Sequence, residues 1–386
     1  MERCMFDRNL KETVLYASQK FPVITLTGPR QSGKTTLIKM IFKDKAYVSL
    51  EDLDNRLFAL NDPKSFLNMY PDGAIIDEAQ HAPDLFSYIQ TRVDTNKVMG
   101  EFILTGSQNL LLSEKISQSL AGRTAVLQLL PCQKNECAID NNNLYDLIFK
   151  GFYPAIYDRD IDPNLYYKSY LSTYVERDLK SMINIKNLSK FHLFLKLCAG
   201  RIGQLLNISS LGSECGLNNG TVSSWLSILE ESYVLFLLKP HHVNFNKRLT
   251  KQPKLYFYDT GLASHLLSID SEKTLKTHYA RGSLFENFII LELLKNRFNK
   301  GLESNLYFWR DHHGKEIDVL VDKGQSLKAI EIKSAETINE SFFKGLKYWH
   351  SLDDKNNDLH LVYGGDQVQK RGDIQVYPWF DSYKIE

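Results

Sequence analysis

Residues 21–36 read FPVITLTGPRQSGKTT, and this stretch decides the fold of the first third of the chain. Residues 21–27 form a short apolar run rich in residues that favour β-strands, and the loop 28–35 follows it at once. Residues 36–42 then read as the start of a helix. A strand, a loop of the pattern G-x-x-x-x-G-K-T and a helix, in this order, predict a phosphate-binding loop.

The residue types of this loop fit the chemistry of a nucleotide phosphate. Gly28 and Gly33 permit backbone geometry that other residues resist, so that successive N–H groups point at phosphate oxygens. The helix that follows directs its positive end at the same anion. We expect Lys34 to reach the β- and γ-phosphates of ATP and the Thr35 hydroxyl to bind Mg²⁺. The other expected nucleotide-binding residues are Pro29, Arg30, Gln31, Ser32 and Thr36.

Residues 74–78 (AIIDE) predict the second half of the site, because they read as a buried strand that ends in two acids. Asp77 is placed to hold Mg²⁺, through water in the simplest arrangement, and Glu78 is placed to polarise the attacking water. A glutamate at this place favours hydrolysis of ATP over binding alone. The sequence therefore predicts a Mg²⁺-dependent ATPase.

Two further features of this part of the chain have alternative interpretations. Thr105, Ser107 and Asn109 end or follow the apolar run 101–105, and they are either γ-phosphate sensors or the polar residues of an ordinary turn. Arg123 is either a catalytic arginine finger that acts on a neighbouring copy or a surface cation.

The same region predicts a parallel sheet. Five β-like runs alternate with helical segments, at residues 21–27, 46–50, 74–77, 101–105 and 124–130. This alternation is typical of an α/β domain whose sheet is covered by helices on both faces.

Composition sets the broad class of protein. A chain of 386 residues predicts two or three domains. The formal net charge of +1 argues against a wholly basic nucleic-acid binder and leaves a local basic patch open. The five cysteines are scattered, and Cys132 and Cys137 are too isolated for a four-ligand zinc site. Without a signal-like or membrane-spanning apolar stretch, we expect a cytoplasmic protein with reduced thiols and no membrane partner.

The middle of the chain predicts helices and a winged helix. Residues 165–181 have helical apolar spacing, and residues 209–217 and 218–230 read as two short helices joined by a turn at Gly216. The runs 233–238 and 254–258 complete the pattern as the hairpin of a wing.

The sequence leaves open whether this module binds DNA or another protein. Residues 218–230 contain no Lys or Arg, although a DNA-reading helix normally carries cations for phosphate. Asn218, Asn219 and Ser223 are candidates for base contacts. The expected wing has four cations that are candidates for phosphate contacts, namely Lys247, Arg248, Lys251 and Lys254.

The C-terminal part contains an acidic pattern typical of nucleases. Residues 316–321 and 327–333 read as a hairpin, which places Asp318 beside Glu331 and Lys333. Carboxylates on adjacent strands converge on a divalent metal that activates water, and a Lys two residues after the Glu points to the same side. Glu286, from the apolar helix 283–297, is a possible further acid of this second metal site. The alternative is a set of paired surface charges.

Taken together, these motifs resemble predicted prokaryotic AAA-type ATP-binding proteins with a C-terminal domain of unknown function. The stretches that carry the resemblance are 26–37 (LTGPRQSGKTTL), 74–80 (AIIDEAQ), 103–109 (ILTGSQN), 120–123 (LAGR), 174–179 (YVERDL), 203–211 (GQLLNISSL), 256–262 (YFYDTGL), 285–289 (FENFI), 308–321 (FWRDHHGKEIDVLV) and 329–334 (AIEIKS). The resemblance implies an ATPase domain of the additional-strand type in residues 1–135. It implies a helical and winged-helix domain in residues 136–260 and a PD-(D/E)xK, restriction-endonuclease-like α/β domain in residues 261–386. A clear second sensor arginine is missing, which argues against a conventional ring-forming motor.

Three functions follow as hypotheses. The first is an ATP-driven switch or regulator whose C-terminal half meets a protein partner, a second copy or DNA. The second is an ATP-controlled, metal-dependent DNA nuclease for defence or repair. The third is a DNA-binding protein with little ATP turnover, and the intact Lys34 and Glu78 argue against it.

Overall fold

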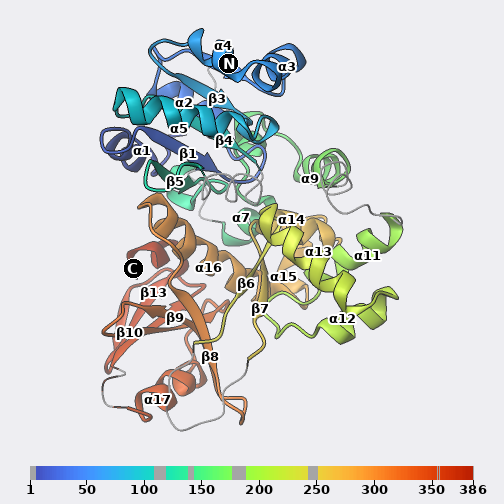
Figure 1. Cartoon of the computed structure of the whole chain (residues 1–386). Coiled ribbons are helices and arrows are strands. Elements are labelled where there is room, and N and C mark those ends of the chain that lie inside the picture. Colours follow the sequence, from blue (N-terminus) through green and yellow to red (C-terminus); the bar gives the residue numbers. More distant parts are fainter. Residues whose placement is uncertain are drawn as a thin grey trace. The chain divides into compact units, whose positions relative to one another are not determined.

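The computed structural model describes residues 6–107, 119–137, 143–175, 188–241, 251–353, 355 and 357–385. These residues form two compact units, which are coloured along the chain in Figure 1. The N-terminal unit consists of Met1–Cys132, Glu231–Tyr233 and Arg297–Leu302 in their described parts. The C-terminal unit consists of Gln133–Glu230, Val234–Asn296 and Glu303–Glu386. The predicted division into three domains stays a prediction.

The sheet of the N-terminal unit has five parallel strands in the order β2-β3-β4-β1-β5. They are β1 (Val23–Thr27), β2 (Tyr47–Ser49), β3 (Ala74–Asp77), β4 (Phe102–Gly106) and β5 (Thr124–Gln128). Each strand overlaps one of the five apolar runs of the sequence. The prediction of a parallel α/β sheet is therefore confirmed.

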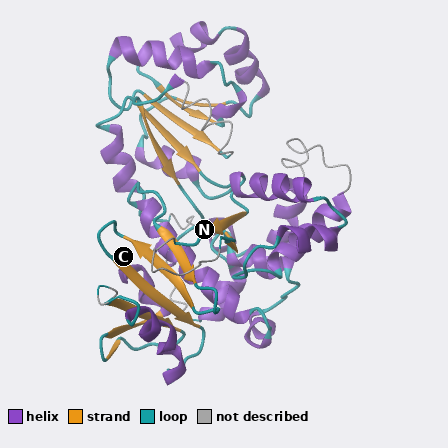
Figure 2. Cartoon of the chain, turned by 60° about the horizontal axis from the view of Figure 1, so that its bottom comes forward, coloured by secondary structure: helices purple, strands orange, loops and turns teal. Residues whose placement is uncertain are grey.

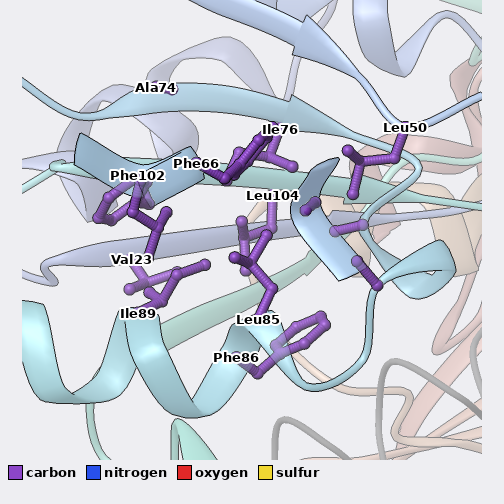
Figure 3. Close-up of a cluster of buried hydrophobic side chains, with 14 of the residues drawn as sticks. Val23, Leu50, Phe66, Ala74, Ile76, Leu85, Phe86, Ile89, Phe102 and Leu104 are labelled. Atoms are coloured by element: carbon purple, nitrogen blue, oxygen red, sulfur yellow. The ribbon is translucent and has the colours of Figure 1, made fainter. Parts of the chain in front are cut away.

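Helices cover both faces of this sheet. They are α1 (Lys11–Ser18), α2 (Lys34–Ile41), α3 (Leu53–Asn61), α4 (Pro63–Asn68), the 3-10 turn η1 (Ala79–His81) and α5 (Leu85–Asn96). Because successive strand residues point to opposite faces, Ile75 and Ile76 enter different cores. Ile75 packs in the core that includes residues of α1 and α2, whereas Ile76 shares its core with Phe66 of α4 and Phe86 of α5 (Figure 3).

Two of these helices begin at aspartates that cap them. Asp52 accepts a 3.0 Å hydrogen bond from the Asn55 amide, and Asp62 accepts one of the same length from the Ser65 amide. Such caps satisfy amide groups that have no partner in the first turn of a helix. Pro63 follows Asp62 directly, where its fixed backbone angle suits the first helical residue. Local chemistry thus sets where α3 and α4 begin.

The strand order brings the sequence motifs to one edge of the sheet. Thr27 at the end of β1 is in register with Gly106 of β4, and Ile76 of β3 is in register with Leu104. Because the strands are parallel, the segments that follow β1, β3 and β4 all leave from the same edge. β4 lies between β1 and β3.

The C-terminal unit begins with helices. They are η2 (Lys134–Glu136), α7 (Leu144–Lys150), α8 (Pro154–Asp158), α9 (Pro163–Tyr170), the π-helical turn η3 (Leu171–Val175), α11 (Leu188–Ala199), α12 (Ile208–Cys215) and α13 (Asn219–Glu231). The helix expected at 165–181 therefore ends as α9 at Tyr170 and changes to a π-helical turn. The rest of that expected helix, with most of the YVERDL stretch, lies outside the described residues.

Two predicted elements of the middle region are present. α12 ends at Gly216, which adopts the left-handed conformation with φ 61°, and α13 follows. β6 (Leu235–Leu238) and β7 (Lys254–Phe257) form an antiparallel pair. Lys247 and Arg248 of the expected wing lie outside the described residues. The winged-helix assignment stays a prediction.

The remaining strands form a mixed six-stranded sheet in the order β12-β13-β11-β10-β9-β8. Figure 2 shows the strands and helices of both units. The strands are β8 (Leu306–Arg310), β9 (Glu316–Asp322), β10 (Leu327–Lys333), β11 (Asp358–Tyr363), β12 (Gln369–Arg371) and β13 (Ile374–Pro378). The helices are α14 (Thr260–Leu266), α15 (Glu272–Thr277), α16 (Arg281–Asn299), η4 (Glu340–Phe343), α17 (Lys344–His350) and η5 (Trp379–Ile385). β9 and β10 pair antiparallel, which confirms the predicted hairpin. Among the described helices, none is long and apolar enough to cross a membrane.

Candidate functional site

The loop between β1 and α2 has the backbone shape that its glycines were expected to provide. Gly28 has φ 146° and Gly33 has φ 93°, both in the region that other residues rarely adopt. A Cβ on Gly28 would lie 2.1 Å from the carbonyl oxygen of Leu129, so no larger residue fits there. Gly33 precedes the first residue of α2, and the amino end of that helix therefore borders the loop. These are features of an anion-binding loop.

Lys34 lies inside this loop. Its Nζ donates hydrogen bonds to the carbonyl oxygens of Gly28, at 2.9 Å, and Pro29, at 2.8 Å. Burial lowers the pKa of Lys34 to about 8, although the carboxylates of Glu78 and Asp77 partly offset that effect. The ammonium is thus held where a phosphate would meet it, and its charge depends on pH near 8.

Asp77 at the end of β3 accepts hydrogen bonds from three hydroxyl groups. Its Oδ2 lies 3.0 Å from Thr35 Oγ1 and 2.8 Å from the Tyr47 hydroxyl, and its Oδ1 accepts from Thr105 Oγ1. The Thr35 hydroxyl and the Asp77 carboxylate are hard oxygen donors of the kind that Mg²⁺ prefers, and Mg²⁺ in such sites takes few protein ligands besides phosphate and water. The donor set therefore fits Mg²⁺.

Glu78 directly follows Asp77 and has a distinct set of partners. Its Oε2 accepts from the amide of Ser107, at 3.3 Å, and from the Ser107 hydroxyl, at 3.1 Å, and it contacts Nε2 of Gln80. Glu78 has φ 53°, in the left-handed region where a glutamate is uncommon. Strained backbone of this kind concentrates at functional sites. The structure thus holds a carboxylate beside the loop in a fixed orientation.

Of the expected γ-phosphate sensors, two are described and both contact the acids. Thr105 donates to Asp77 and Ser107 donates to Glu78, whereas Asn109 lies outside the described residues. A sensing role for these residues stays a prediction. Tyr47 is a further residue of the site that no sequence motif indicates, because the pairing of β2 with β3 brings its hydroxyl to Asp77.

Two arginines of the N-terminal unit differ in their positions. Arg30, in the loop, forms an ion pair with Glu51 at 3.2 Å. Arg123 directly precedes β5. Its carbonyl oxygen accepts a hydrogen bond from the amide of Val23 at the start of β1, and the loop follows the other end of that strand. Its guanidinium binds both carboxylate oxygens of Asp94, at 2.5 and 2.9 Å. Arg123 is therefore not part of the site in its own chain, and a role as a finger towards another copy stays a prediction.

The four residues of the predicted second site lie in one network of charges. Asp318 of β9 and Glu331 of β10 both contact Lys333, at 3.0 and 2.6 Å. Burial and the nearby Asp318 raise the pKa of Glu331 well above its ordinary value, although Lys333 opposes this shift. Glu286 of α16 accepts from Lys254 at 3.2 Å, and burial raises the pKa of Glu286, with a smaller contribution from Asp318 and an opposing one from Lys254. Across the part of the chain that the structure describes, no group of three or more His, Cys, Asp or Glu is arranged to hold a metal ion.

Lys254 corrects one expectation. Its position in the sequence predicts a wing cation that contacts phosphate. In the structure it is only 2% exposed, and it forms ion pairs with Glu286 and Glu316. Its partner acids come from α16 and β9, so the spacing of residues along the chain gave no sign of them.

Family models match most of the chain. The AAA domain matches residues 20–138, a domain of unknown function (DUF8612) matches residues 141–273, and another domain of unknown function (DUF4143) matches residues 281–381. Uncharacterized proteins of Mycobacterium bovis and Mycobacterium tuberculosis are each 30% identical over 327 residues, which are 83% of this chain and 72% of theirs. An uncharacterized protein of Methanocaldococcus jannaschii is 24% identical over 340 residues, covering 79% of this chain and 73% of its own.

Solved structures show more distant likenesses. A Walker-type ATPase of Pyrococcus abyssi has 13% sequence identity and a TM-score of 0.48, with 69% of this chain and 97% of that chain covered. RuvB of Thermotoga maritima has 16% identity and a TM-score of 0.30, with 59% and 88% covered. From the mycobacterial relatives and the matched domains, the chain belongs to the family of these uncharacterized proteins, with an ATPase-like AAA domain before a DUF4143 domain.

Proposed function

We propose that this protein binds and hydrolyses ATP with Mg²⁺ and that the nucleotide acts as a switch on its C-terminal half. The observation that carries the proposal is the contact of Thr35 with Asp77, beside an ammonium that is held inside the loop. The phosphate requires the ammonium of Lys34, and the metal requires Thr35 and Asp77; all three residues lie at one edge of the sheet.

Binding follows from the loop. Its amides and the amino end of α2 offer positive partial charge to the phosphates, and Lys34 adds a full charge. To reach a phosphate, Lys34 exchanges the carbonyls of Gly28 and Pro29 for phosphate oxygens. Thr35 and Asp77 would hold Mg²⁺, which supplies neutralising charge for the phosphate oxygens when it is bound. The AAA-domain match over residues 20–138 supports this assignment.

Hydrolysis needs a base that is oriented towards water. Glu78 is the candidate, because Ser107 and Gln80 hold its carboxylate beside the loop. A positioned base of this kind contributes roughly 10²- to 10⁴-fold in rate.

The switch has a physical connection near the loop. The Tyr233 hydroxyl lies 2.9 Å from Thr27 Oγ1, and Thr27 is the last residue of β1 before the loop. Tyr233 is buried, has φ 56° and lies between α13 and β6 in sequence. It belongs to the short segment Glu231–Tyr233 of the N-terminal unit. A change in the position of the loop would therefore be passed, through the contact of Thr27 with Tyr233, to the segment that leads into β6.

We expect the partner of the switch to be a protein or a second copy in the cytoplasm. The exposed face of α13 has small polar side chains, namely Asn219, Ser223, Ser224 and Ser227. A face without cations lacks the electrostatic contribution that dominates DNA affinity. DNA contact stays the alternative, and salt-dependent binding that falls on mutation of Lys247 and Arg248 would support it.

The proposal is tested by ATP turnover of the wild type and of Lys34→Ala, with and without DNA. We expect turnover by the wild type and loss of ATP binding or turnover in the variant. Lys43→Ala is a matched control, because Lys43 is an exposed lysine beyond the end of α2. Full hydrolysis by Lys34→Ala would reject the proposal.

A further inference from the structure

Four carboxylates of the C-terminal unit gather around two lysines, of which Lys254 is buried and Lys333 is partly exposed. Lys333 contacts Asp318 and Glu331, and Lys254 contacts Glu286 and Glu316. A nuclease with the D…E-x-K pattern needs one lysine and a divalent metal beside its acids. This chain brings a second ammonium, from β7, to the same group of acids.

The surroundings of Lys254 require it to remain charged and paired. Its side chain is 3% exposed, so water does not solvate the ammonium. Burial alone lowers the pKa of a lysine, but here the carboxylates of Glu286, Asp318 and Glu316 outweigh burial and raise it above its ordinary value. Removing one member of such a buried ion pair strongly destabilises the folded protein, because the other charge is left buried without a partner. Lys254 is therefore a fixed cation of this cluster.

We propose that Lys254 is the resident cation of the acid cluster, supplying the positive charge that a divalent metal supplies in nucleases of this pattern, so that the cluster is a metal-free structural network. Arg310 adds a further cation, because its Nη1 lies 2.9 Å from Glu316. The four acids are thus already paired with three cations of the protein, namely Lys254, Lys333 and Arg310. A divalent ion entering this cluster gains little attraction and meets two ammonium groups at close range.

The network also has a structural role. Lys254 lies on β7, within the residues matched by DUF8612, whereas Glu286 and Glu316 lie within the residues matched by DUF4143. The Tyr256 hydroxyl, also from β7, donates to Glu286. Two side chains of one strand thus attach that strand to α16 and β9. The lysine holds together two matched segments inside one compact unit.

The test measures Mn²⁺ binding by the full-length protein without nucleotide, using calorimetry and thermal unfolding. Wild type and Asp318→Asn are expected to respond identically to Mn²⁺. Lys254→Met leaves the acids without the Lys254 ammonium, and we expect its affinity for Mn²⁺ to be at least tenfold higher than that of the wild type. The double variant Lys254→Met/Asp318→Asn is expected to lose this gain. Lys328→Met is the control, since Lys328 is also buried on β10 but its ammonium faces Asp358.

Two results would overturn the proposal. One is Mn²⁺ binding or Mn²⁺-dependent DNA cleavage by the wild type that Asp318→Asn abolishes. The other is a folded Lys254→Met that gains no affinity for Mn²⁺. If Lys254→Met does not fold, Lys254→Arg, which keeps the charge, is expected to fold and to remain insensitive to Mn²⁺, and the comparison of wild type with Asp318→Asn still decides. None of these measurements depends on ATP turnover, so the nucleotide proposal is tested separately.

Discussion

The Thr35 hydroxyl lies 3.0 Å from the Asp77 carboxylate, although the two residues are 42 positions apart in the chain. Thr35 lies in the first turn of the helix after the loop, and Asp77 ends β3. β4 separates β3 from β1, so the contact spans two strand spacings across the edge of the sheet. The two expected metal ligands are therefore brought together by strand order and not by local sequence.

This relationship predicts the effect of Thr35→Val. The variant keeps the shape of the side chain and removes the hydroxyl, so Mg·ATP loses one oxygen ligand. Hydrogen bonds to charged groups contribute about 1.5–3 kcal/mol, which corresponds to roughly 10- to 100-fold in affinity. Equilibrium binding of Mg·ATP checks this result, with Thr91→Val on the exposed surface of α5 as the control. Equal affinity of the two variants would show that Thr35 is not a ligand.

The pKa of Lys34 predicts a pH dependence of ATP binding. In the free protein this pKa is lowered from 10.5 to about 8, so the ammonium loses its proton as pH rises through that value. Phosphate needs the charged form and raises the pKa again on binding. We therefore expect weaker Mg·ATP binding at pH 9 than at pH 7, and proton uptake on binding near pH 8.

Calorimetry in two buffers with different ionisation enthalpies measures that proton uptake. Lys34→Arg is the matched variant, because a guanidinium keeps its charge throughout this range. Its binding is expected to show no proton uptake from this position. The explanation fails if the wild type also takes up no protons near pH 8.

The position of Arg123 predicts a small effect of its removal. Arg123→Ala loses an exposed ion pair with Asp94. Arg123 lies beside the start of β1, far from the loop at the other end of that strand, so ATP turnover should stay unchanged. Turnover measured across a range of protein concentrations checks this, with Asp94→Asn as the partner variant. A loss of turnover in Arg123→Ala but not in Asp94→Asn would instead indicate a finger that acts on a second copy.

The contact of Tyr233 with Thr27 predicts how the switch is transmitted. Tyr233→Phe keeps the buried ring and removes the hydroxyl that meets Thr27. We expect ATP binding to be retained. Hydrogen exchange of the amides of β6 is expected to respond to ATP in the wild type and to respond less in the variant. The same response in both proteins would place the connection elsewhere.

The sequence predicted those parts of the fold that depend on neighbouring residues. The loop 28–35 was identifiable because strand, loop and helix follow one another directly, and the five strands because each is an apolar run. The hairpin of β9 and β10 was predicted for the same reason, since one short turn connects its strands.

Contacts across strands were not predictable in the same way. The Tyr47 hydroxyl reaches Asp77 through the register of β2 with β3, and no motif marks that register. Lys254 looked like a wing cation because the residues around it are basic, but its partners come from α16 and β9. The sequence shows which residues are charged, but the partner of each charge depends on the tertiary structure.

ATP turnover by Glu78→Gln tests the central claim most directly. The amide keeps the size of the side chain and its contact with Ser107, but it does not accept a proton from water. We predict Mg·ATP binding within about twofold of the wild type and turnover reduced by roughly 10²-fold or more. Turnover equal to that of the wild type, or loss of Mg·ATP binding itself, would contradict the assignment of Glu78 as the base of an ATP-hydrolysing site.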